Sequence, residues 1–339
     1  MEADYSGELT DALRRARQEG ISVAITGSGS KSFLTRSADP EIESRLLSVV
    51  SHAGVVDYRP DELVVTVRCG TPLKELQQIL ARQDQMLAFE PPQFQGQGTV
   101  GGAVACGLAG PGRPWRGSVG DSVLGVVMIN GLGQKLTFGG QVMKNVAGYD
   151  VSRLQAGAFG TLGVLLDLSL KVIPRPASEA TRVLELDAEA ALKTMRRLAL
   201  SPVPITATCY FDGVLRIRLS GAEPAVTAAA DGLGGESEDV AFWERLNHHD
   251  LPLFRSSHAL ACRHSKPASA VGDTDQLIEW SGARRWGPAI GNEPVFGEGY
   301  ASHLCGGEGL FNHYYSRIRT AFDPDMILNT EVGRADVSS

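Results

Sequence analysis

Positive charge and long apolar runs are both scarce in this sequence of 339 residues. Lysine and arginine number 32 against 39 acidic residues, so the formal net charge is −7. A nucleic-acid-binding surface requires a basic face, and this charge balance argues against a nucleic-acid partner. No stretch approaches the ~20 consecutive apolar residues of a membrane-spanning helix, and the first residues are acidic and polar. We therefore expect a cytoplasmic protein without a membrane span.

Cysteines in metal-binding patterns are also missing. The five cysteines are Cys69, Cys106, Cys209, Cys262 and Cys305, and no two form a C-x-x-C pair. Neither zinc nor iron–sulfur ligand spacing is present, so we expect no metal site in this chain. Free, buried thiols of a cytosolic protein are the expected state. Any iron–sulfur centre that works with this protein must then belong to another chain.

Glycine, in contrast, is abundant, with 39 residues against a usual share of ~7%. It concentrates between Gly96 and Gly163, and an earlier cluster, Gly27–Ser32, directly follows an apolar run. Glycine lets backbone N–H groups approach an anion without a Cβ in the way, and successive N–H groups form a concave anion site. Two such loops suit the two phosphates of one dinucleotide, and we interpret them as a flavin site. Taken alone, the first loop is also compatible with a tight turn between strands.

Hydrophobic periodicity predicts mixed helices and strands. A helix is expected over residues 8–19 with Gly20 as its end, and a second helix after Thr71 as cap and Pro72 as first helical residue. Strands are expected at 21–25, 46–50, 55–58, 63–67 and 164–173, and a hairpin at 122–129 and 134–138. Composition shifts after the proline-rich stretch Pro174–Ser178, so we place a domain boundary near residue 176.

Two shorter motif matches are disfavoured. Gly96, Gly98 and Gly101 fit G-x-G-x-x-G literally, but a Rossmann fingerprint must directly follow a strand. The adjacent Pro91 and Pro92 cannot donate the hydrogen bonds of a central strand. Gly27–Ser32 lacks glycines that a Walker A loop requires, and no aspartate follows a convincing second strand to hold magnesium. Nicotinamide-binding and ATPase functions are therefore poor interpretations.

Several longer motifs resemble the FAD-binding domain of the vanillyl-alcohol oxidase and p-cresol methylhydroxylase family. They are Thr26–Ser30, Tyr58–Val67, Gly98–Gly102, Gly148–Asp150 and Gly160–Gly163, with a similar ending at Phe322–Pro324 and Asn329. Within that family, the sequence is similar to FAD-binding subunits of bacterial glycolate oxidase complexes. The segments that carry this similarity are Phe89–Phe94, Gly110–Trp115, Phe138–Asp150 and Ile278–Trp286. The resemblance covers most of the chain and is densest up to Pro176.

The resemblance implies an α+β fold with a p-cresol methylhydroxylase-type FAD-binding domain over residues 1–176, divided into two subdomains near 70–85. A cap domain follows over 177–300, and residues 301–339 return to the first domain. In the family, the first loop and Gly98–Gly102 hold the pyrophosphate, and the later segments lie along the ribityl chain and ring. The implied FAD contacts are Gly27, Ser28, Gly29, Ser30, Lys31, Ser32, Gly98, Thr99, Gly101, Gly102, Asn145, Gly148, Tyr149, Asp150, Thr161, Gly163 and Val164.

Two positions depart from the family pattern. Many relatives attach FAD covalently through a histidine in the first loop, and this chain has none there, so non-covalent FAD is expected. Relatives usually end in Asn-Pro-Gly, whereas here Thr330 and Glu331 follow Asn329. The role of this altered ending is left open.

Oxidation of a 2-hydroxy acid by a flavin requires a group that takes the hydroxyl proton and cations that hold the carboxylate. The seven histidines show no clear arrangement for this chemistry. Candidates are Arg113 and Arg116 in a glycine-rich loop, and His258 and His264 in a locally basic stretch. Arg113 and Arg116 are equally compatible with a packed loop. The histidines are more typical of ordinary surface or cap residues, and the basic stretch around His258 and His264 is also compatible with a partner surface.

The resemblance implies a function in a complex. The chain would be an FAD-binding oxidoreductase subunit that helps oxidise glycolate or a similar small 2-hydroxy acid to the 2-oxo acid. Its partners would be a larger FAD-containing glycolate oxidase subunit and an iron–sulfur subunit, through which the complex would reach the inner face of a membrane. Two alternatives stay open: a stand-alone FAD enzyme for another alcohol or sugar, and a non-catalytic assembly subunit.

Overall fold

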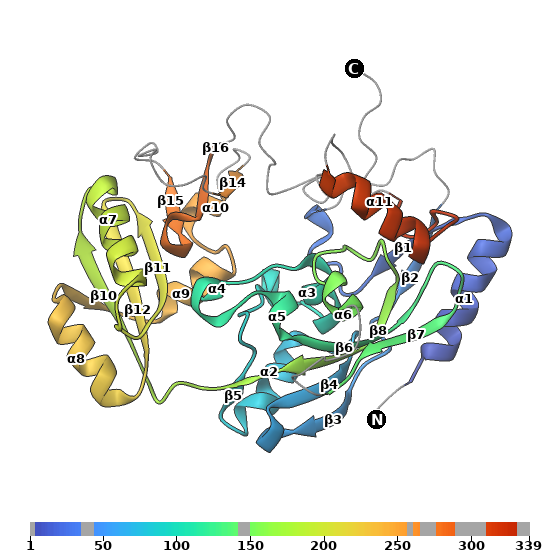
Figure 1. Cartoon of the computed structure of the whole chain (residues 1–339), viewed down its shortest axis with the longest axis horizontal. Helices are drawn as coiled ribbons and strands as arrows, with labels where there is room; N and C mark the ends of the chain where they lie inside the picture. Colours follow the sequence, from blue (N-terminus) through green and yellow to red (C-terminus); the bar gives the residue numbers. More distant parts are fainter. Residues whose placement is uncertain are drawn as a thin grey trace.

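The computed structural model describes residues 4–34, 44–141, 150–255, 260–264, 276–288 and 310–330. These residues form two lobes that lie side by side, and the chain crosses between them after β9 (Ile173–Pro174) (Figure 1). The predicted boundary near residue 176 falls between β9 and the first strand of the second lobe, β10 (Ser178–Glu185). The mixed α+β class expected from the sequence is confirmed.

A small parallel sheet opens the first lobe. β1 (Ser22–Thr26) pairs with β2 (Ser44–Ser48), and α1 (Ser6–Glu19) packs its apolar face on it through Leu13 and Ala16. Gly20 has a positive φ of 70° and ends α1, as expected. Because β1 runs directly into the first glycine cluster, the packing of α1 fixes where that loop begins.

A five-stranded antiparallel sheet forms the centre of the first lobe. Its order is β3 (Val55–Arg59), β4 (Val64–Arg68), β8 (Val164–Lys171), β6 (Val123–Ile129) and β7 (Lys135–Gly139). The central strand β8 is buried on both faces: Leu168 and Leu170 join the core with α2 (Leu73–Ala81) and α3 (Val100–Cys106), whereas Leu166 joins the core with α1. The predicted hairpin is confirmed as β6 and β7. The chain passes from the small sheet to the large one between β2 and β3, earlier than the break predicted near residues 70–85.

One predicted helix start is wrong in detail. Pro72, not Thr71, is the residue that precedes the first turn of α2, and it gives no side-chain cap. The Thr71 hydroxyl instead accepts a hydrogen bond from the Gly54 backbone N–H at 2.9 Å. A long-range contact of the hydroxyl therefore replaces the local cap. The remaining short elements of this lobe are η1 (Ser32–Leu34), η2 (Pro60–Glu62), β5 (Gln85–Met86), η3 (Phe94–Gly96), α4 (Arg113–Arg116), α5 (Val119–Ser122) and α6 (Val151–Leu154).

The second lobe is a seven-stranded sheet with helices on it. The strand order is β13 (Glu236–Glu238), β10, β12 (Val214–Gly221), β11 (Ile205–Phe211), β15 (Leu277–Glu279), β16 (Arg284–Pro288) and β14 (Leu260–His264). One core gathers apolar side chains of α7 (Ala188–Ala199) and α8 (Glu223–Leu233), and another those of α9 (Ala241–Asn247) with Trp286. The two short helical segments η4 (Trp280–Gly282) and α10 (Pro252–Arg255) complete the lobe.

The chain then returns to the first lobe. α11 (Leu310–Phe322) lies over β1 and β2 in Figure 1. After it, Ile327 and Leu328 enter the core beside β1, where the Val23 N–H donates to the Ile327 carbonyl at 2.7 Å. The end of the described chain is thus hydrogen-bonded to the strand that leads into the first glycine loop. No helix in the described ranges is long and apolar enough to cross a membrane.

Candidate functional site

The two glycine-rich loops lie against one another. The Ser28 hydroxyl of the first loop donates to the Gln97 carbonyl of the second. Thr99 packs so closely on Gly27 that a Cβ added at Gly27 would clash with the Thr99 hydroxyl. Only glycine at position 27 therefore allows this approach of the two loops. Segments about 70 residues apart in sequence form one surface, as the dinucleotide interpretation requires.

The second loop is held by its own close packing. The Thr99 hydroxyl accepts the Gly102 N–H at 3.2 Å, which fixes the start of α3. A Cβ on Gly101 would lie 2.6 Å from the Cβ of Cys69, at the end of β4. Gly101 thus allows α3 to pack closely against the end of β4, and Gly101 and Gly102 also line the cavity beside the loop.

A cavity of about 250 Å³, which we call the glycine-loop cavity, lies between these loops and the end of the chain. Backbone and small side chains form most of its wall. It is lined by Ala24, Ile25, Thr26, Gly27, Ser28, Gly29, Ser30, Lys31, Ser32, Leu46, Val49, Cys69, Thr99, Gly101, Gly102, Ala105, Cys106, Phe159, Gly160, Gly163, Leu165 and Asn329. Within this described lining, Lys31 is the only charged residue.

Lys31 is buried although it is a lysine. It is 7% exposed, and its Nζ has no hydrogen-bond partner among the described residues. Its Nζ faces the ring of Phe94 at 5.8 Å from the ring centre, and a Cβ on Gly98 would lie 3.2 Å from it. Burial lowers the pKa of Lys31 below its ordinary value of 10.5. An unpaired ammonium therefore lies where the two glycine loops meet.

Asn329 closes the opposite wall. Its side-chain Nδ2 donates to the Phe159 carbonyl at 2.6 Å, and its Oδ1 accepts the Ile25 N–H at 2.7 Å. Its own N–H donates to the Val23 carbonyl at 2.8 Å. One asparagine thereby joins β1 to the segment before β8, and Asn329, which precedes the altered residues of the ending, lines the cavity.

The structure gathers most of the predicted FAD contacts. Those that line the cavity are Gly27, Ser28, Gly29, Ser30, Lys31, Ser32, Thr99, Gly101, Gly102 and Gly163. Gly98 lies beside Lys31. Thr161 and Val164 are fully buried and do not line the cavity, and Asp150 instead caps α6 by accepting the Arg153 N–H at 3.3 Å. Asn145, Gly148 and Tyr149 lie outside the described residues.

Several residues that line the cavity were not among the predicted FAD contacts. Cys69, Cys106 and Phe159 bring apolar surface to the wall. Phe159 directly precedes the Gly160–Gly163 motif, whereas no cofactor pattern includes either cysteine. Burial raises the pKa of Cys106 to about 11 and that of Cys69 well above 9.0, so both thiols are neutral at physiological pH. The sequence offered one signal, which is glycine at positions 101 and 160. Glycine there indicates that another part of the chain approaches the backbone closely, but it does not identify that part.

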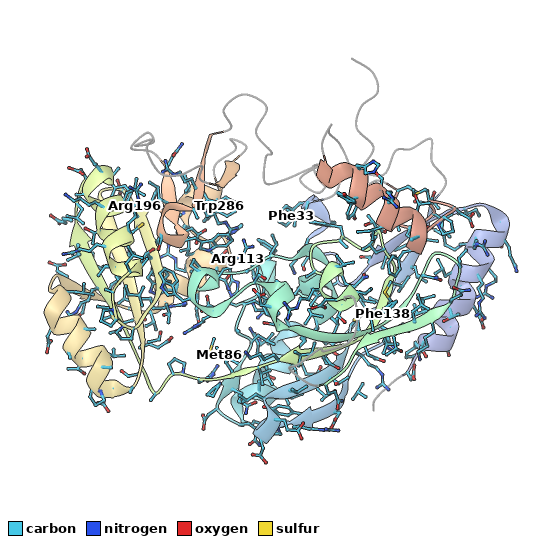
Figure 2. The ribbon with its side chains drawn as sticks, in the orientation of Figure 1. Phe33, Met86, Arg113, Phe138, Arg196 and Trp286 are labelled. Atoms are coloured by element: carbon cyan, nitrogen blue, oxygen red, sulfur yellow. The ribbon has the colours of Figure 1, made fainter. Side chains whose placement is uncertain are left out.

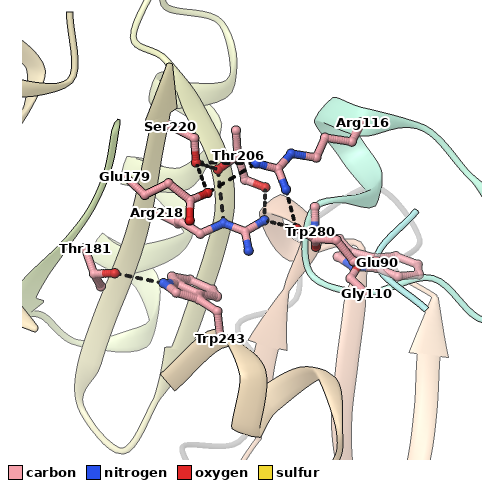
Figure 3. Close-up of polar contacts among 11 residues, drawn as sticks. Glu90, Gly110, Arg116, Glu179, Thr181, Thr206, Arg218, Ser220, Trp243 and Trp280 are labelled. Atoms are coloured by element: carbon pink, nitrogen blue, oxygen red, sulfur yellow. Dashed lines mark hydrogen bonds and ion pairs between the residues drawn. The ribbon is translucent and has the colours of Figure 1, made fainter. Parts of the chain in front are cut away.

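The proposed catalytic arginines lie between the lobes, not in the glycine-loop cavity. Arg116 is bound by Glu90 at 2.5 Å and by Glu179 at 3.4 Å, and Arg218 of the second lobe shares Glu90 at 2.6 Å (Figure 3). A second cavity of about 460 Å³ borders this cluster. Arg113 also lies at the junction of the lobes (Figure 2), with its guanidinium 4.7 Å from the ring centre of Trp280.

These contacts make the arginines part of the lobe interface. Arg113 and Arg284 each place a guanidinium within 5 Å of the Trp280 ring centre, at 4.7 and 4.5 Å, and the Trp280 indole N–H donates to the Gly110 carbonyl at 3.1 Å. Of the predicted histidines, His258 lies outside the described residues, and His264 is the last residue of β14. In the described residues, no group of three or more His, Cys, Asp or Glu side chains is placed to hold a metal ion.

Comparison with known proteins agrees with this site. Residues 2–139 match an FAD binding domain. The chain is 41% identical to the glycolate oxidase subunit GlcE of Escherichia coli (strain K12) over 344 aligned positions, which cover 97% of each chain. It is 29% identical to the glycolate oxidase subunit GlcD of Bacillus subtilis (strain 168) over 207 positions, 60% of this chain and 43% of that one. Among solved structures, an alkyldihydroxyacetonephosphate synthase matches with a TM-score of 0.70 at 14% identity, over 98% of this chain and 75% of the other, which shows a shared fold.

Proposed function

Because this chain belongs to the family of glycolate oxidase subunits that includes GlcE, we propose that it works as the FAD-carrying relay of a glycolate oxidase-type complex. The chain is an FAD-binding oxidoreductase of the p-cresol methylhydroxylase-type fold. In the proposed role, a 2-hydroxy acid such as glycolate is oxidised to the 2-oxo acid in the complex. The electrons then pass to an iron–sulfur partner subunit through the FAD of this chain.

The residues of the glycine-loop cavity fit FAD. The backbone of Gly27–Ser32 is open toward the cavity, and the second loop packs against it through Thr99. The unpaired Lys31 ammonium supplies the charge that an anionic diphosphate requires. These three features in one cavity are the observation that carries the proposal.

In the proposed complex, each wall of the cavity has a separate task. The two glycine loops bind the diphosphate, and Phe159 and the neutral Cys106 provide an apolar wall along the rest of the cofactor. Asn329 links the Phe159 and Ile25 backbones through its side-chain amide, which fixes this part of the cavity wall. When bound, FAD accepts two electrons from a carbon that bears a hydroxyl group and releases them to a carrier.

The attachment of FAD is proposed to be non-covalent. No histidine stands in the first loop, and the lining thiols Cys69 and Cys106 are neutral and thus weak nucleophiles. Precipitating the purified protein with acid tests this: the yellow colour should stay in the supernatant. Colour retained in the pellet would show a covalent bond.

Co-expression tests the function itself. The chain purified alone should show a flavin absorbance band that dithionite bleaches, yet reduce an artificial dye with glycolate only slowly. Co-expression with the larger flavoprotein subunit and the iron–sulfur subunit should give rapid, glycolate-dependent dye reduction. Full activity of the isolated chain would favour a stand-alone enzyme, and a colourless protein that takes up no FAD would contradict the proposal.

A further inference from the structure

A buried lysine without a hydrogen-bond partner needs a physical reason. Lys31 is 7% exposed, and its Nζ is unpaired among the described residues. Desolvating an ammonium costs free energy unless a partner compensates, and a partner would ordinarily be a carboxylate or several carbonyl oxygens. Lys31 therefore destabilises the unliganded protein.

The surroundings of Lys31 indicate the missing partner. The described lining of the glycine-loop cavity contains no acidic residue, so none of these residues supplies the compensating charge, which an anionic ligand in the cavity would supply. The lysine is at the junction of the two loops: a Cβ added at Gly98 would lie 3.2 Å from its Nζ, and Gly29 of the first loop lines the cavity with open space at its Cβ position. An anion at this junction would contact both loops and the ammonium together.

We propose that Lys31 is the specificity-determining residue that makes this chain select a phosphorylated flavin over an uncharged one. This inference rests on the proposed function and assigns one task to one side chain. Lys31 pairs with the diphosphate of FAD, whereas the flavin ring is held by other parts of the cavity. The ring of Phe94 lies 5.8 Å from Nζ, a contact that accommodates an ammonium without neutralising its charge.

The test compares two flavins on four forms of the full chain. FAD and riboflavin share the ring and the ribityl chain, but riboflavin lacks phosphate. Lys31→Met keeps the apolar stem and removes the charge, Lys31→Arg keeps the charge, and Lys74→Met is the matched control because Lys74 is exposed on α2. Dissociation constants come from flavin fluorescence on the protein freed of cofactor.

Lys31→Met should weaken FAD binding by about 10- to 100-fold, which is the range of one hydrogen bond to a charged group, and leave riboflavin binding unchanged. Lys31→Arg should retain a preference for FAD over riboflavin, and Lys74→Met should behave as the wild type. Because burial lowers the pKa of Lys31 below 10.5, FAD affinity of the wild type should fall as the pH rises through that lowered pKa, and that of Lys31→Met should not.

Stability gives a readout that does not involve FAD. Without cofactor, Lys31→Met should unfold at a higher urea concentration than the wild type, because it removes an unpaired buried charge. Unchanged FAD affinity in Lys31→Met, or an equal loss of FAD and riboflavin affinity, would overturn the inference while the proposed function stands. A wild type that binds neither flavin would overturn the proposed function instead.

Discussion

Glu90 and Arg218 join the two lobes through a buried ion pair, with Oε1 of the glutamate 2.6 Å from Nη2 of the arginine. Their side chains are 10% and 8% exposed. The same carboxylate also binds Arg116 of its own lobe at 2.5 Å, so one negative charge compensates two guanidinium groups. Arg116 also reaches Glu179 of the second lobe at 3.4 Å, so this cluster of ion pairs holds the second lobe against the first.

Glu90→Gln should lower the free energy of unfolding by about 3–5 kcal/mol, because it leaves the buried Arg218 guanidinium without its ion-pair partner and Arg116 with only the more distant Glu179. Urea unfolding followed by circular dichroism measures the effect. Glu62→Gln is the matched control: Glu62 pairs with Arg59 on the surface, where such pairs contribute less than about 1 kcal/mol. Equal effects of the two substitutions would show that Glu90 does not hold the interface.

Gly101→Ala should destabilise the first lobe by about 1–3 kcal/mol, because its Cβ would lie 2.6 Å from that of Cys69 and force α3 away from β4. FAD affinity should fall with it, since Thr99 moves with the helix. Gly7→Ala in α1 is the control: a Cβ there meets nothing within 4 Å, and the variant should gain about 0.5–1 kcal/mol in stability. A Gly101→Ala variant as stable as the wild type would contradict the close packing.

Asp121 links stability to pH. Hydrogen bonds from the Ser118 backbone N–H, and then from the Ser118 hydroxyl, lower the pKa of Asp121 below its ordinary 3.8. The folded pKa lies below the unfolded one, so the stabilisation is complete above 3.8 and is lost as pH falls through the folded value.

Asp121→Asn should therefore cost about 0.5–2 kcal/mol at neutral pH, as loss of a cap does, and progressively less in acid. Unfolding free energies across this pH range measure it. Ser118→Ala removes the hydroxyl that donates to the Asp121 carboxylate and accepts the Asp121 N–H, but keeps the Ser118 N–H donor, so its cost should also shrink in acid but not disappear. A cost of Asp121→Asn that does not vary with pH would exclude this linkage.

Features that depend on neighbouring residues could be predicted from the sequence. Gly20 ends α1 because glycine tolerates positive φ, and the hairpin of β6 and β7 follows from two β-rich runs around a turn. The cap at Thr71 was predicted wrongly because its hydroxyl can bond either to the start of α2 or to a group distant in sequence. In the structure it accepts the distant Gly54 N–H. Gly54 is 17 residues away, and no local pattern records it.

Glycine spacing alone determined that two loops of this chain present open backbone, because the missing Cβ is a property of each residue by itself. Tertiary structure decided what those loops surround. Lys31 became a buried, unpaired cation, and Asn329 came to bridge Ile25 and Phe159, which is 170 residues away. Burial and such contacts arise only when β1, α3 and the segment Ile327–Asn329 pack together. The charge environment of a side chain depends on these spatial neighbours, and sequence order does not specify them.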